Sequence, residues 1–70
     1  MTRTQINKLA NTIVSYEQAL KDPNNSYEKK KEAESQINQI AMMLSRLPNG
    51  LRVMQQVDEV VQLKLESINI

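Results

Sequence analysis

The chain offers few places at which a helix can be interrupted. Its 70 residues include one glycine and two prolines, and these fall in two polar stretches, "KDPNNS" at 21–26 and "LPNG" at 47–50. Gly, Pro, Asn, Asp and Ser are the residues that favour turns, each through its own backbone or side-chain geometry. The two breaks therefore divide the chain into three segments of about twenty residues, each rich in good helix formers.

Helix-entry signals support the same division. Thr2 with Gln5 and Asn25 with Glu28 both have the spacing of a capping box, in which each side chain accepts from the other residue's backbone N–H. A longer helix running through the second break is disfavoured, because Pro48 restricts the residue before it. We therefore predict helices at about 3–21, 26–47 and 50–67.

The apolar spacing predicts how these helices pack. In the first two segments apolar residues recur every three or four positions, which is typical of a helix laid against another helix. The residue numbers of facing pairs, such as Ile6 with Leu44, keep a nearly constant sum across each turn, as antiparallel neighbours require. Ile37 belongs to both ladders, so we expect Ile37→Asp to unfold the protein. The sequence predicts one all-α domain, residues 1–70: an up-down-up antiparallel three-helix bundle with short loops.

The third segment carries more apolar residues than one inward face can hold. Its predicted inward face comprises Leu51, Met54, Val57, Val61, Leu65 and Ile68. Further apolar residues extend that face by roughly another 100°, and one residue of the second helix points away from the predicted core. We take this surplus as a predicted partner-binding surface of Met42, Val53, Val60 and Leu63. The alternative is a bundle that leaves a few apolar side chains exposed, as most proteins do.

The charges separate in this layout, although the net charge is only +1. Four bases, with no acid among them, fall where the first helix begins, the second ends and the third begins: Arg3, Lys8, Arg46 and Arg52. This basic pole could hold a phosphate backbone or an acidic protein surface, or could serve only to keep that end solvated. The run "EKKKE" at 28–32 is flanked by acids and is typical of a solvated helix face.

Catalytic and metal chemistry has little to use in this chain. The sequence contains no Cys and no His, which excludes disulfides and the usual structural zinc sites. Asp58 and Glu59 are adjacent and diverge on a helix, and there is no glycine-rich phosphate loop or activated nucleophile. We therefore predict no enzyme, no catalytic residue, no metal, no cofactor and no small-molecule substrate.

These observations favour a non-enzymatic helical protein-interaction module, a regulator, inhibitor or adaptor that presents the third helix to another protein or to a second copy. A chain this short has a marginal core, which favours a partner subunit. One alternative is a nucleic-acid binder using the basic pole, and another is a structural subunit of a larger assembly. We expect a complete cytoplasmic protein that starts at Met1 and does not cross a membrane, because the longest apolar run is "IAMML".

Overall fold

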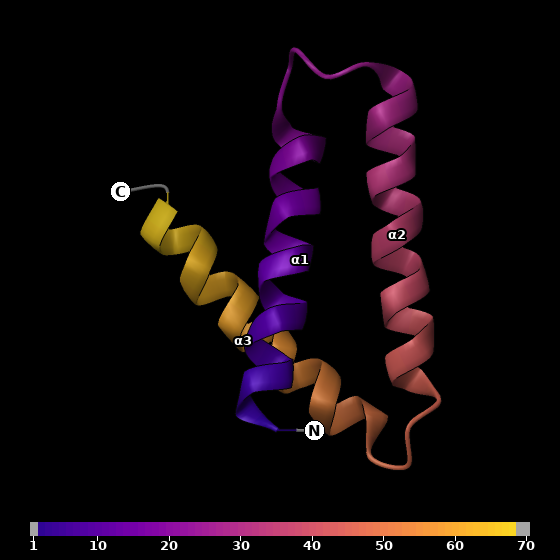
Figure 1. Cartoon of the computed structure of the whole chain (residues 1–70), viewed down its shortest axis with the longest axis vertical. Helices are drawn as coiled ribbons and strands as arrows, with labels where there is room; N and C mark the ends of the chain where they lie inside the picture. Colours follow the sequence, from indigo (N-terminus) through magenta and orange to yellow (C-terminus); the bar gives the residue numbers. More distant parts are fainter. Residues whose placement is uncertain (1, 69–70) are drawn as a thin grey trace.

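The computed structural model describes residues 2–68, which form three α-helices: α1 (Arg3–Lys21), α2 (Tyr27–Ser45) and α3 (Gly50–Ile68). All three helices pack on one another, so the predicted up-down-up three-helix bundle is confirmed. In Figure 1, α1 and α2 lie antiparallel, whereas α3 runs obliquely behind α1. Helix α3 packs more extensively against α1 than against α2.

Side-chain caps fix the starts of α1 and α2. The Thr2 hydroxyl accepts from the Gln5 N–H at 3.2 Å, and the Thr2 N–H donates to the Gln5 side-chain oxygen at 2.9 Å, which confirms the predicted capping box. At α2 the cap is Ser26, whose hydroxyl accepts from the Lys29 N–H at 3.3 Å, and not Asn25 as predicted. The Asn25 amide is used elsewhere, because it donates to the carbonyl of Ala19 at 2.8 Å near the end of α1.

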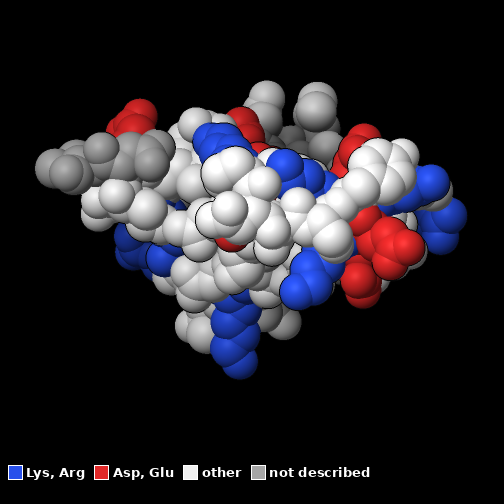
Figure 2. Space-filling view, turned by 90° about the horizontal axis from the view of Figure 1, so that it is seen from above, with Lys and Arg blue, Asp and Glu red and all other residues white. Residues whose placement is uncertain are grey.

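The first turn is a hydrogen-bonded β-turn of residues 22–25. The Asn25 N–H donates to the Asp22 carbonyl at 3.2 Å, and an Asp22 carboxylate oxygen accepts from the Asn24 N–H at 2.9 Å. Pro23 occupies the second position of the turn, where its fixed φ is favourable. Figure 2 views this end of the molecule, over which basic and acidic side chains interleave. In the run 28–32, Glu28, Lys29, Lys31 and Glu32 are exposed, which agrees with a solvated face.

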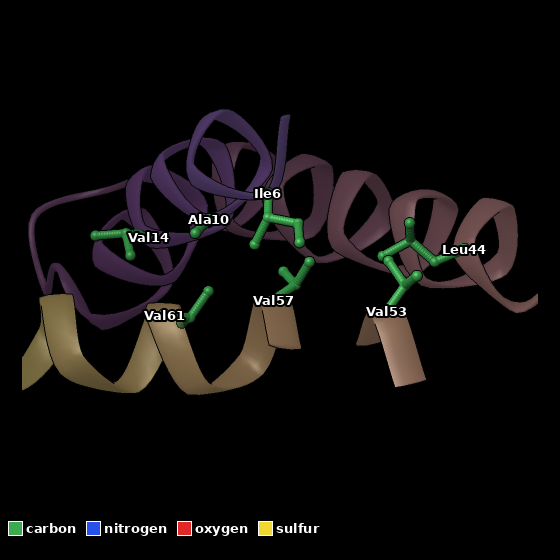
Figure 3. Close-up of a cluster of buried hydrophobic side chains, with 7 residues drawn as sticks. All are labelled: Ile6, Ala10, Val14, Leu44, Val53, Val57 and Val61. Carbon is green, nitrogen blue, oxygen red and sulfur yellow. The ribbon is translucent and has the colours of Figure 1, made fainter. Parts of the chain in front are cut away.

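The core is a row of aliphatic side chains, most of them valine or alanine (Figure 3). Three valines of α3 point at α1 and α2: Val53 toward Leu44, Val57 toward Ile6, and Val61 toward α1 near Ala10. Ala10 is completely buried. A side chain this small lets two helix backbones approach closely, which explains why α1 and α3 make the most extensive contact of the bundle.

The face that α3 turns inward differs from the predicted one. Leu51 and Ile68, both predicted to face inward, are 74% and 53% exposed, whereas Val53, predicted to lie beside the inward face, is 2% exposed. Val57 and Val61 are buried as predicted, but Gly50 and Val53 complete the buried stripe in place of Leu51 and Ile68. The helix is therefore rotated about its axis relative to the sequence prediction.

Gly50 explains this rotation. It is buried where α3 begins, and a Cβ built there would overlap the carbonyl oxygen of Leu44 and lie 3.2 Å from the carbonyl carbon of Ser45. Its φ is not positive, so the glycine is needed for this close approach and not for an unusual backbone conformation. Since Val53 and Val57 follow it by three and seven positions, they share its face of the helix. The backbone contact thus selects which stripe of α3 enters the core.

We expect Gly50→Ala to destabilise the fold, although alanine favours helix by about 1 kcal/mol over glycine. The added methyl group must push α3 away from the end of α2, at a cost of about 1–3 kcal/mol. Urea denaturation followed by circular dichroism measures this loss, with Gln55→Ala, at an exposed position of α3, as the control. A Gly50→Ala protein more stable than wild type would show that the close approach does not constrain the fold.

In the structure Ile37 contributes less to the core than the sequence predicts. This residue is half-buried and lies outside the set of side chains packed on the core cluster, whereas Val57 is 3% exposed at its centre. We expect Val57→Ala to lower the free energy of unfolding by about 2 kcal/mol, because it leaves a cavity. Ile37→Ala deletes more atoms but should cost about 1 kcal/mol or less, since its side chain is already partly in water.

Denaturation midpoints of the two variants, measured at low protein concentration, test this order. A larger loss of stability for Ile37→Ala than for Val57→Ala would show that Ile37 is the central contact of both helix pairs, as the sequence predicts.

Candidate partner-binding groove

An apolar groove opens where α3 diverges from α2. Its volume is about 320 Å³, and it is lined by all three helices. We call it the central groove; its lining consists of Ile13, Glu17, Lys21, Ile37, Ile40, Ala41, Leu44, Met54, Val57, Asp58, Val61, Gln62 and Leu65. Leu44, Val57 and Val61 also belong to the buried core cluster, so the groove is the place where the core reaches solvent.

The walls of the central groove are made of large, half-buried aliphatic side chains. Ile37 and Ile40 come from α2, Met54 and Leu65 from α3, and Ile13 from α1. The sequence predicts core positions for Ile37, Met54 and Leu65, and Ile13 and Ile40 have the same three- and four-residue spacing. In the structure the facing residues of α2 and α3 do line one space, but that space is open on one side. An apolar groove with a few polar groups is a candidate binding site.

The rim of the central groove carries both signs of charge. Lys21 and Asp58 are exposed, and Glu17 is half-buried. Glu17 and Lys21 come from the last turns of α1, whereas Asp58 comes from the middle of α3. An apolar floor with a polar rim is the usual anatomy of a protein-binding surface.

The structure separates the four residues predicted to bind a partner. The placement predicted for Val53 is wrong, because this residue is buried in the core and not available at the surface. Leu63 is 66% exposed, and Val60 is half-buried against the core. Met42 is 57% exposed on α2 and lines neither groove. Partner binding by Met42, Val60 and Leu63 stays a prediction.

Val60 and Leu63 share a second, more open hollow between α1 and α3. It has a volume of about 760 Å³, and we call it the side groove; its lining comprises Arg3, Ile6, Asn7, Gln56, Glu59, Val60, Leu63, Lys64 and Ser67. Six of these nine residues are polar or charged. The side groove is therefore a less apolar surface than the central groove, although it brings together two of the predicted contact residues.

The wall residues of the central groove were missed as site residues because their spacing predicts burial. Ile37, Ile40, Met54 and Leu65 satisfy the antiparallel ladder as well as any core residue does. The signal that could have found them is Gly50, since a glycine at the start of a helix permits a close backbone approach that rotates the helix.

The basic pole has the predicted placement. The start of α1, the end of α2 and the start of α3 meet at the lower end of Figure 1. Arg3, Lys8, Arg46 and Arg52 are all exposed. Arg46 caps the C-terminus of α2, where a positive charge is favourable, but Arg3 and Arg52 lie in first turns that contain no acid. Those two charges oppose the helix dipole.

Residues 2–68 contain neither a metal-ligand cluster nor a membrane-spanning helix. Nowhere in this range do three potential metal-ligating side chains come together, and none of α1, α2 and α3 is long and apolar enough to span a bilayer. Comparison of the chain with protein-family models, with curated proteins and with solved structures found no match.

Proposed function

We propose that the protein is a non-enzymatic helical interaction module that binds an apolar helical face of a protein in its central groove. The observation that carries the proposal is the continuity of this groove with the core: Leu44, Val57 and Val61 are buried core residues and line the groove as well. A helix laid against them would extend the same core.

The geometry of the walls supports a helical occupant. Ile37, Ile40 and Leu44 recur every three or four residues along α2, as do Met54, Val57, Val61 and Leu65 along α3. Such stripes present ridges and grooves into which the side chains of another helix fit. Ala41, small and half-buried, lies among these larger side chains. The contribution of α3 to partner binding was predicted, but this proposal assigns it to a different stripe of that helix.

In this function the protein acts by occupying a surface of its partner. A regulator, an inhibitor, an adaptor and a subunit of an assembly all work in this way, and each needs the groove and no catalytic group.

Three exposed glutamines provide a matched test of which surface is used. Gln62 lines the central groove, Gln56 lines the side groove, and Gln39 of α2 lines neither. A photo-crosslinking amino acid placed at each position, in the cell that makes the protein, should give a protein adduct from position 62. We expect no adduct above background from position 39, because it lines neither groove.

Mass spectrometry of the adducts gives the identity of the occupant and its contact residues. Adducts from position 56 alone would move the interaction to the side groove with Val60 and Leu63. Equal labelling from positions 62 and 39 would contradict the proposed function.

The basic pole supports a second candidate function, the binding of a nucleic-acid backbone. Arg3 and Arg52 add positive charge to helix N-termini that are already electropositive, an arrangement that costs stability unless an anion is present. Lys8 and Arg46 add to the same end of the molecule. The near-neutral net charge of +1 weighs against this candidate.

Salt dependence tests the second candidate. If the pole binds phosphates, the affinity for duplex or single-stranded nucleic acid should fall steeply with salt, and Arg52→Ala should flatten the logarithmic slope by about one unit. Fluorescence anisotropy with a labelled oligonucleotide measures this, with Lys30→Ala at the opposite end of the bundle as the control. We expect no binding at low salt, which would leave the pole as an acidic-protein contact or a solvated end.

A further inference from the structure

The molecule is flat, and its accessible surface area is larger than is usual for a monomeric protein of its mass. Its extents are 38 × 27 × 15 Å, and its radius of gyration is 12.6 Å, compared with about 11 Å for a typical domain of this length. The chain exposes 5393 Å², whereas a monomeric protein of 8.0 kDa exposes about 4,500 Å². Several hundred square ångströms are therefore exposed beyond the usual amount.

This excess is comparable with what one partner contributes to a stable interface, about 800 Å². The half-buried aliphatic side chains that line the central groove contribute to this exposed surface, although the most exposed large apolar side chains, such as Tyr27 and Leu51, lie outside the groove. A cover over the central groove would bury its half-buried wall residues.

We propose that the cover is a second copy of this chain, and that the central groove is the interface of a twofold-symmetric homodimer. The inference rests on the proposed function and names its partner. In a twofold dimer the same patch meets itself, so the patch must be self-complementary in shape and charge. The central groove satisfies the charge condition, because its rim carries Lys21 together with Glu17 and Asp58.

The placement of these charges allows opposite signs to meet. Lys21 lies at the end of α1, Asp58 lies in the middle of α3, and both line the groove. In the proposed dimer a twofold rotation pairs Lys21 of one copy with Asp58 of the other, twice in the dimer. A net charge of +1 per chain adds little repulsion between copies. Ile37, Ile40, Met54 and Leu65 of both copies then form one shared core.

Sedimentation equilibrium gives the first test. At about 100 µM the wild-type protein should have twice the chain mass of 8.0 kDa, and dilution to about 0.1 µM should release monomer, as for a micromolar dissociation constant. Ala41→Arg fills the groove without removing a large side chain, and should raise the dissociation constant at least tenfold. Gln39→Arg makes the same charge change on the opposite face of α2 and should leave it unchanged.

The rim charges give a sharper test, because Lys21 and Asp58 are exposed and their replacement spares the core. Lys21→Glu and Asp58→Lys should each weaken self-association, since each places like charges together. An equimolar mixture of the two variants should form a heterodimer that associates more tightly than either variant alone. A mixture that associates no better than its components would overturn the proposed twofold pairing.

Methionine methyl NMR provides a readout on the wild-type chain and needs no variant. Met54 lines the central groove, whereas Met42 lies outside it on α2. On dilution the methyl resonance of Met54 should shift and that of Met42 should stay in place. A shift of Met42 alone would move the interface to another face and overturn the inference.

The inference and the proposed function fail in different ways. A wild-type chain that stays monomeric at about 100 µM overturns the homodimer. If position 62 then crosslinks to a different protein, the proposed function stands with another occupant. If it crosslinks to nothing, both are wrong.

Discussion

The contact between Gly50 and the last turn of α2 is the constraint on which the rest of the structure depends. Here two backbones meet without a side chain between them, because a Cβ at Gly50 would overlap the carbonyl oxygen of Leu44. This contact fixes the rotation of α3 and places Val53 directly beneath Leu44 (Figure 3). Because the preceding turn, residues 46–49, is short, this contact also restricts the direction in which α3 runs.

The core and the groove are consequences of this one placement. The stripe that α3 turns inward consists of a glycine and valines, and α1 meets it with a fully buried alanine. Small residues bring α1 and α3 close together, so their contact is extensive. The larger aliphatic residues, two isoleucines of α2 with Met54 and Leu65, are left half-exposed around the central groove. Helix α3 therefore buries its valines Val53, Val57 and Val61 and leaves the larger Met54 and Leu65 partly in water, the reverse of what an isolated core would favour.

The sequence predicts what is decided locally. The two turns follow from clusters of Pro, Gly and Asn, and the cap at Thr2 follows from its spacing to Gln5. The pairing of α1 with α2 is equally accessible, because each helix has one narrow apolar stripe and the turn between them is short. Ile6 and Leu44, matched by their residue numbers, are both in the core.

The rotation of α3 could not be predicted in the same way. Its apolar residues cover a wide arc, so more than one stripe could face inward, and the periodicity does not distinguish them. The choice depends on a backbone contact between residues that the sequence assigns to a turn. For the same reason the central groove was not predicted: its walls have the pattern of a core, and only the oblique course of α3 leaves them open. The basic pole was predictable, because it depends on which helix ends meet and not on how a helix is rotated.

The proposed partner would couple folding to association at the central groove. Its floor is part of the monomer core, so a partner that covers Val57 and Val61 also shields the side chains that hold α1 and α3 together. Any ligand that binds only the folded state stabilises it by mass action. The chain is small, contains no Cys and no His, and has a core made largely of valines, features that leave a fold with little stability in reserve. Because the uncovered wall residues continue that core, the proposed partner would stabilise the fold through the same apolar surface that gives it affinity.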